Sequence, residues 1–172
     1  MKIGILSDTH KKSKLSQEAI DHLIKNGAEF LIHAGDIVEP EVLDQLKKSG
    51  VKYVAVYGNN DAHLVNYHNK YNLVQEPYYF KLANTKFKLM HLPFYMSPDA
   101  DIVIFGHTHT FECDFKNNTL FLNPGEACAR NKPLMEFVML DIDNNNYNVI
   151  YYNKKPKESE YNESHFFFER TK

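Results

Sequence analysis

Long apolar segments are absent from this sequence of 172 residues. It contains no run of about 18 apolar residues, so it offers no transmembrane helix. Its N-terminus lacks the charged and then apolar stretch of a secretory signal peptide and leads directly into a short β-type segment. We therefore expect a cytoplasmic protein without a membrane partner.

Cysteine and an excess of charge of one sign are also lacking. Cys113 and Cys128 are the two cysteines, and they form no C-x-x-C pair, which argues against a disulfide framework or a zinc knuckle. We interpret them as core or surface thiols. Acidic and basic residues nearly balance at a formal net charge of -2. Nothing therefore favours an obligate nucleic-acid partner or a nuclease with a basic channel.

What is present is an ordinary globular composition, 43% hydrophobic, in a length that suits one domain without internal repeats. Apolar residues at helical spacing from Leu15 to Ile24 predict a helix that stops at Gly27. A second helix should begin near Pro40 and stop at Gly50. These helices alternate with predicted strands, and this order implies parallel crossovers.

The predicted strands are short and rich in β-branched and aromatic residues. Five of them span residues 2–6, 30–34, 51–57, 86–90 and 101–105. Three hairpins are expected from residues 78–90, 111–122 and 134–152, because turn residues interrupt each of these segments. We expect an α/β half followed by a β-rich half, with two sheets face to face and helices outside.

The last segment, residues 153–172, is charged but contains Tyr161 and the run Phe166-Phe167-Phe168. This aromatic cluster is too apolar for a solvated tail. We interpret the segment as an edge strand or short helix that covers the core. An oligomer contact is the alternative, because exposed apolar patches mark interfaces.

Five polar motifs directly follow the five predicted strands. They are Asp8-Thr9-His10, Gly35-Asp36, Gly58-Asn59-Asn60-Asp61, His91 and Gly106-His107-Thr108-His109. In open α/β sheets, ligands bind beyond the carboxyl ends of the strands, so these motifs can converge on one rim. Carboxylate, amide and imidazole groups suit Mn, Fe, Zn or Ni, and the set is large enough for two ions.

Each motif alone also has an ordinary structural explanation. Asp is a frequent cap and turn residue, Gly and Asn accept turn conformations, and His91 alone would be a half-buried strand histidine. The Gly-His-Thr-His motif is the most specific, because two imidazoles two residues apart can reach adjacent ions. All five motifs in this order favour a two-metal hydrolytic centre.

The ordered motifs, followed by Asn123-Pro124-Gly125, resemble the calcineurin-like metallophosphoesterases, in particular their small single-domain phosphodiesterase branch. The resemblance implies an α/β fold, a four-layer α/β/β/α sandwich of two mixed sheets with flanking helices. This domain would span residues 1–152. Residues 153–172 would be a C-terminal extension that packs on the same domain.

The resemblance also implies two overlapping sets of metal ligands that share one carboxylate. The first ion would be bound by Asp8, His10, Asp36 and His109. The second ion would be bound by Asp36, Asn59, His91 and His107. Asp36 is then the bridge, and the implied catalytic residues are Asp36, Asn59, Asp61 and His107. Mn is the expected metal, with Ni, Zn and Fe as alternatives.

Phosphate esters are anionic, so their hydrolysis needs positive charge at the phosphoryl oxygens and a nucleophile at neutral pH. Asp8 and Asp36 bring two negative charges and the other ligands are neutral, which leaves two divalent ions with a net charge of about +2. Two such ions can share a bridging hydroxide. We expect a phosphodiesterase that acts on a small phosphate ester.

Two features depart from the family pattern. Many relatives have His at the position of Asn60, and Asn60 cannot act as a general acid, while Asp61 is then free to orient a ligand. His63 and His68 lie nearby but are also explained as solvated helix or loop residues. The segment from Leu92 to Ala100 is short and apolar, and either narrows the pocket or forms part of a partner surface.

Two further questions stay open in the sequence. Lys11, Lys12 and Lys14 form a basic cluster beside the first motif, either a solvated loop or a phosphate clamp. The alternative function is a catalytically weak metal-binding scaffold for protein-protein interaction, similar to the retromer subunit that resembles this family. The intact ligand set favours the enzyme, and a homo-oligomer is compatible with either function.

Overall fold

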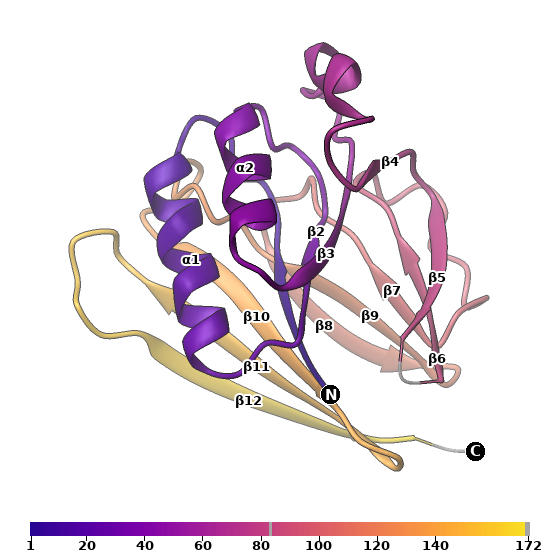
Figure 1. Cartoon of the computed structure of the whole chain (residues 1–172). Coiled ribbons are helices and arrows are strands. Elements are labelled where there is room, and N and C mark those ends of the chain that lie inside the picture. Colours follow the sequence, from indigo (N-terminus) through magenta and orange to yellow (C-terminus); the bar gives the residue numbers. More distant parts are fainter. Residues whose placement is uncertain (83, 171–172) are drawn as a thin grey trace.

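The computed structural model describes residues 1–82 and 84–170 and shows two mixed β-sheets that lie face to face (Figure 1). The larger sheet has seven strands in the order β12-β11-β10-β1-β2-β3-β4. These strands are β1 Lys2–Leu6, β2 Phe30–His33, β3 Lys52–Val56, β4 Leu73–Val74, β10 Met135–Ile142, β11 Asn146–Lys154 and β12 Asn162–Glu169. The predicted two-sheet sandwich is confirmed.

The smaller sheet has five strands in the order β5-β6-β7-β9-β8. These strands are β5 Tyr78–Leu82, β6 Thr85–Leu89, β7 Ile102–Ile104, β8 Phe111–Lys116 and β9 Thr119–Pro124. The three predicted hairpins form, as the antiparallel pairs β5 with β6, β8 with β9 and β10 with β11. β1, β2 and β3 are parallel neighbours, as the crossovers predict, and β6 and β7 are parallel as well.

The main core fills the space between the two sheets. Alternate side chains of each strand point into it, such as Ile3 and Ile5 of β1 and Phe87 and Leu89 of β6, all fully buried. Burial of side chains of this size contributes about 1.5–3 kcal/mol each. This core holds the sheets against each other, so that loops from both sheets meet at one rim.

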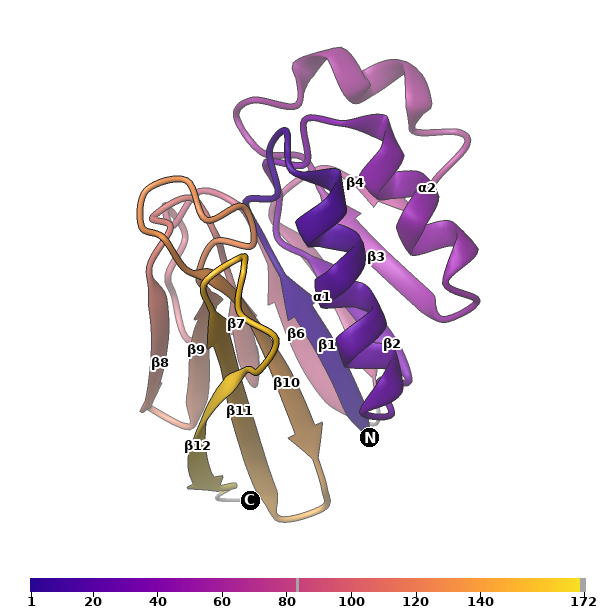
Figure 2. The same ribbon diagram turned by 90° about the vertical axis from the view of Figure 1, so that its left-hand side faces the viewer.

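Helices α1 (Ser13–Lys25) and α2 (Pro40–Lys48) lie side by side on the outer face of the larger sheet (Figure 2). Their apolar faces are buried against this sheet, and both helices match the predicted segments closely. The strand β4 and the short 3-10 helix η1 (Ala62–Tyr67) were not predicted. Among the described residues, no helix has the length and apolar character needed to cross a membrane.

The outer face of the smaller sheet carries no helix within the described parts of the chain. The coil over residues 92–100 covers part of this face instead. Met96 packs against its apolar residues, and Lys88, only 1% exposed, donates hydrogen bonds to Ser97 and Asp99. The fourth layer of the sandwich is therefore a coil, because prolines interrupt a segment that is too short for a packed helix.

The C-terminal segment forms an edge strand, one of the two structures that the sequence left open. β12 pairs antiparallel with β11 at the end of the larger sheet. Phe166 and Phe168 turn toward the core, with ring centroids 5.4 Å from Phe111 and 5.5 Å from Phe115 of β8. Phe167 is 61% exposed on the opposite face. The tail thus closes one open side of the sandwich.

Candidate metal centre

The five predicted motifs meet at one rim of the sandwich, where both sheets contribute. The loops after β1, β2 and β3 belong to the larger sheet, and the loops after β6 and β7 belong to the smaller one. Hydrogen bonds and short contacts join all seven expected ligands: Asp8, His10, Asp36, Asn59, His91, His107 and His109. Strand ends predicted from the sequence therefore converge as expected.

The first ligand group consists of Asp8, His10, Asp36 and His109. Their candidate ligand atoms all lie within 4.8 Å of one another. Nε2 of His10 is 3.4 Å from Nε2 of His109 and 3.7 Å from Oδ2 of Asp36. Nε2 of His109 is 3.3 Å from Oδ1 of Asp8. Two imidazole nitrogens and two carboxylate oxygens thus face a common point.

The second ligand group is centred on Asn59. Its Oδ1 atom lies 3.0 Å from Nε2 of His91 and 3.0 Å from Nδ1 of His107. Nε2 of His91 is also 3.5 Å from Oδ1 of Asp36. Asp36 therefore turns one carboxylate oxygen to each group. His107 is exposed, whereas Asp36 and His91 are buried.

One buried atom tests whether these residues fit a cation. Oδ2 of Asp8 accepts hydrogen bonds from Ser7 Oγ at 2.7 Å and from the His107 backbone N–H at 3.1 Å. Oδ1 of Asp8 is buried and accepts none. Burial raises the pKa of Asp8, and the hydrogen bond from Ser7 and the charges of His91 and His109 offset this effect only in part. A cation beside Oδ1 would compensate it, so the residues present fit a metal ion.

The backbone at the ligands is held in an unusual conformation. Five of the expected ligands have positive φ angles: Asp8 (53°), His10 (43°), Asp36 (54°), His107 (70°) and His109 (58°). Side-chain-bearing residues rarely adopt this region, and such strain clusters at ligand sites. Gly58 allows the loops to approach closely, because a Cβ atom there would lie 2.2 Å from the Asp36 backbone nitrogen.

Buried acceptors orient two of the histidines. Nδ1 of His91 donates to the carbonyl of Ala34 at 2.8 Å, and Nδ1 of His109 donates to Oε2 of Glu126 at 2.5 Å. Each contact leaves Nε2 directed at the ligand cluster. Glu126 is fully buried, and burial would raise its pKa, but the hydrogen bonds from His109 and from two backbone N–H groups lower it.

Asp36 is held ionised by its surroundings. Burial acts to raise its pKa, but hydrogen bonds from His91 and from Asn60 outweigh burial and lower the pKa below the ordinary value. The backbone N–H of Asn60 donates to Oδ1 at 2.9 Å, and its side-chain Nδ2 donates to Oδ2 at 2.7 Å. The Asn60 amide therefore positions the shared carboxylate.

Asp61 lies beneath the ligand loops and is fully buried. Its carboxylate accepts backbone N–H bonds from Gly58 at 2.8 Å, Ile37 at 3.1 Å and Val38 at 2.7 Å. These contacts join the loop after β2 to the loop after β3. The carboxylate of Asp61 thus fixes the loops that carry Asp36 and Asn59.

Sequence reasoning missed three supports of the centre, of which His33 and Glu126 are buried and Glu76 is half-buried. His33 accepts the Gly35 N–H and contacts Thr9 Oγ1 at 3.0 Å, and burial lowers its pKa to about 3. Glu76 accepts the backbone N–H groups of His91 and Leu92. Glu126 was also missed, although it directly follows the quoted Asn123-Pro124-Gly125 motif. The acidic side chain of Glu126, directly after this motif, was the sequence feature that could have indicated a residue supporting the centre.

The two additional histidines lie away from the ligand groups. His63 is exposed and its Nε2 contacts the carbonyl oxygen of Val38 at 2.7 Å. His68 is exposed and its Nδ1 contacts the carbonyl oxygen of Val65 at 2.8 Å. Both belong to the surface around η1, in agreement with the solvated-residue interpretation.

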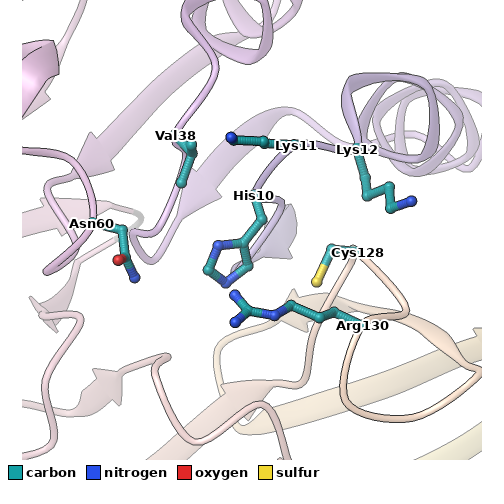
Figure 3. A pocket seen from close by; sticks show the side chains of 7 residues that line it. All are labelled: His10, Lys11, Lys12, Val38, Asn60, Cys128 and Arg130. Carbon is teal, nitrogen blue, oxygen red and sulfur yellow. The ribbon is translucent and has the colours of Figure 1, made fainter.

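A pocket of about 380 Å³ opens beside the first ligand group (Figure 3). It is lined by His10, Lys11, Lys12, Val38, Asn60, Cys128 and Arg130. Figure 3 shows the Cys128 sulfur and the Arg130 guanidinium on the same side of the pocket as the His10 ring. Burial raises the pKa of Cys128 to about 12, so this thiol is neutral. Lys14, the third lysine of the predicted basic cluster, does not line the pocket.

Comparisons with known proteins agree with this geometry. The model of the calcineurin-like phosphoesterase superfamily domain matches residues 1–145, which include every ligand described above. A phosphodiesterase of Methanocaldococcus jannaschii is 29% identical over 163 residues, which cover 87% of this chain and 98% of that protein. The chain belongs to the calcineurin-like phosphoesterase superfamily.

Solved structures show the same fold. The structure of an archaeal phosphodiesterase is similar with a TM-score of 0.74 and 27% identity, over 96% of this chain and 100% of that chain. A Vps29 mutant from Entamoeba histolytica has a TM-score of 0.78 and 22% identity, over 98% of this chain and 99% of that chain. The second likeness concerns the fold alone.

Proposed function

We propose that the protein is a metal-dependent phosphoesterase, more narrowly a phosphodiesterase, that uses two divalent metal ions. The buried Oδ1 atom of Asp8 carries the proposal, because it accepts no hydrogen bond and faces the imidazole nitrogen of His109. Membership of the phosphoesterase superfamily and the similarity to archaeal phosphodiesterases support the same reaction. Mn is the first candidate metal, and Ni, Zn and Fe suit the same ligands.

The two ligand groups would each hold one ion and share Asp36. Divalent ions supply positive charge at the phosphoryl oxygens and make water nucleophilic near neutral pH. Asp8 and Asp36 are the two charged ligands, so the cluster keeps an excess of positive charge for an anionic ester. The low pKa of Asp36 keeps both of its oxygens available as ligands.

The remaining residues position these ligands or contact the substrate. Asn59 lies between His91 and His107, with its Oδ1 atom 3.0 Å from one ring nitrogen of each, so the three side chains would bind the second ion together. His107 and Asn59 are the exposed ligands, and we assign to the His107 imidazole the contact with the entering phosphoryl group. Asp61 acts as a positioning residue, because its oxygens bond the backbone of both adjoining loops.

We also propose that the leaving group departs without a proton from a side chain. Asn60 lines the pocket beside the first group, but its amide nitrogen donates to Asp36 and carries no acidic proton. His63 is engaged with the Val38 carbonyl on the surface. Such an enzyme favours esters whose leaving groups are stable as anions.

Metal content and turnover together test the proposal. We expect two ions per chain by elemental analysis after Mn loading, and hydrolysis of aryl phosphodiesters in a panel with Mn, Ni, Zn and Mg. Asp8→Asn should remove one ion, whereas the exposed Asp21→Asn on α1 is the matched control and should keep both. One ion or none in the saturated wild type would contradict the two-metal mechanism.

A metal-binding scaffold is the second candidate function. It is favoured by Phe94 and Tyr95, which are 74% and 61% exposed on the coil that covers the smaller sheet. Large exposed aromatic side chains are frequent at protein contacts. Two bound ions without turnover of any ester above the rate with free metal would support the scaffold. Turnover that is lost in Asp36→Asn would support the enzyme.

A further inference from the structure

The pocket in Figure 3 is lined by three positively charged side chains, whereas a simple phosphodiester carries one negative charge. Lys11, Lys12 and Arg130 line it, and none of its seven lining residues has a carboxylate. Among the described residues, no carboxylate oxygen lies within 4.0 Å of these three cations, whereas Lys88 and Lys132 are paired with Asp99 and Glu136. The chain as a whole has a formal net charge of -2. Three cations and no carboxylate thus line this pocket.

The pocket adjoins the proposed metal centre directly. His10 belongs both to the pocket wall and to the first ligand group, and Asn60 joins the wall to Asp36 through its amide. Arg130 lines the same pocket as His10 and therefore lies beside a candidate metal ligand.

We propose that this pocket is a subsite for a second phosphoryl group of the substrate, bound by Arg130 and Lys12. This inference rests on the proposed phosphodiesterase function and names its substrate class: a diester whose leaving group carries a terminal phosphate. A diester alone has one negative charge, which leaves three cations beside the centre without a counterion. A terminal phosphate supplies that charge, and the guanidinium fork of Arg130 fits its oxygens.

The size and walls of the pocket agree with this ligand. A volume of about 380 Å³ lies within the range of small-molecule sites and accommodates a phosphate together with part of its linker. Val38 and Cys128 contribute the apolar part of the wall for such a linker. Of the two interpretations of the basic cluster, phosphate binding applies to Lys11 and Lys12 but not to Lys14.

A matched series of substrates tests the subsite. We would measure kcat/KM of the Mn-loaded protein for methyl phenyl phosphates whose phenol, the leaving group, carries an alkyl chain that ends in either a phosphate or a hydroxyl group. Chains of increasing length determine the reach to the pocket. At the best length, the terminal phosphate should raise kcat/KM on the order of tenfold, mainly through KM. No preference for the terminal phosphate at any length would overturn the inference.

Charge-removing variants assign the effect to the pocket. Arg130→Gln and Lys12→Gln should each reduce the preference for the terminal phosphate several-fold. Lys14→Gln removes the same charge near the pocket without lining it, so it should keep the wild-type preference. Equal losses in Lys14→Gln and Arg130→Gln would reduce the effect to general electrostatic attraction and overturn the subsite.

Binding without turnover separates this inference from the proposed function. Calorimetric titration of the Mn-loaded protein needs no hydrolysis. Its two probes are propylphosphonate and propane-1,3-diphosphonate, which has a phosphonate group at each end of the chain. Tighter binding of the diphosphonate that is lost in Arg130→Gln would support the subsite even if no ester were hydrolysed. Equal binding of both probes, in a protein that does hydrolyse diesters, would overturn the subsite and leave the phosphodiesterase function in place.

Discussion

The two ligand groups of the centre differ in charge, burial and support. The first group contains the second carboxylate, Asp8, and its His109 is backed by the buried Glu126. The second group has a neutral amide, Asn59, in place of that carboxylate, and its His107 is exposed. A charged, buried and well-supported group binds a cation more tightly than a neutral and open one. We therefore expect the first group to retain its ion longer.

The largest effect should come from the residue that both groups share. Asp36→Asn removes the negative charge between the groups and should reduce kcat by about a thousandfold or more, because several kcal/mol of charge stabilisation depend on both ions. Asn59→Ala removes one neutral contact of the second group and should reduce kcat less. Steady-state kinetics on an aryl phosphodiester measures both. A larger loss in Asn59→Ala would contradict the role of Asp36 as the bridge.

A smaller effect should follow from weakening the support of the first group. Glu126→Gln keeps the size of the side chain but removes the charge that accepts the His109 N–H, and should weaken metal binding by about 10- to 100-fold. Stepwise dialysis against a chelator with elemental analysis measures this. The wild type should lose the ion of the second group first, and the variant should lose both at similar chelator concentrations.

The exposed Glu41→Gln on α2 removes the same charge and provides the control for Glu126→Gln. It should leave the order of metal loss unchanged. If Glu126→Gln behaves like this control, Glu126 has a purely structural role and the difference between the groups has another origin.

The convergence of the candidate ligands could be predicted from the sequence, because each stands within a few residues of a strand end. Asp8 after β1 and Asp36 after β2 are examples: local patterns place them, and parallel strands bring their loops together. The same reasoning predicted both helices and the three hairpins. Such predictions succeed where the determining contacts are local or follow from sheet geometry.

The supports of the ligands could not be predicted in this way. Glu126 contacts His109 across 17 residues, and the Ala34 carbonyl contacts His91 across 57 residues. No periodic pattern marks such pairs, because only the packing of the two sheets brings them together. The same holds for the tail, where pairing of β12 with β11 decided between a strand and a helix. The difference in support between the two ligand groups could therefore not be predicted from the sequence.

The support beneath the first group should also appear in the pH dependence of stability. Burial lowers the pKa of His33 from 6.5 to about 3, so the unfolded chain binds a proton there that the folded chain does not. The contribution of His33 to the free energy of unfolding is complete above pH 6.5. It decreases as the pH drops toward 3, by about 1.4 kcal/mol per pH unit.

Urea unfolding of the metal-free protein between pH 7 and pH 5 measures this slope. His33→Asn removes the titrating group and should flatten the dependence, whatever its effect on the stability at pH 7. The exposed His165→Asn on β12 is the matched control and should keep the slope of the wild type. An unchanged slope in His33→Asn would mean that other groups determine the acid sensitivity of the fold.

The smallest effect concerns the side of the centre from which the leaving group departs. The pocket lies beside the first group, at His10 and Asn60, so a departing alcohol should meet Asn60, which has no proton to give. In the wild type, kcat/KM should rise steeply as the leaving-group pKa falls across a series of substituted phenyl esters. Asn60→His should raise kcat/KM for the esters with the poorest leaving groups several-fold, at some cost from the lost amide contact with Asp36.

Asn131→His, outside the pocket lining, is the control and should keep the steep dependence. A flat dependence in the wild type would reveal an acid near the pocket. His63 contacts the carbonyl of Val38, a residue of the pocket wall, so His63→Ala would then be expected to make the dependence steep.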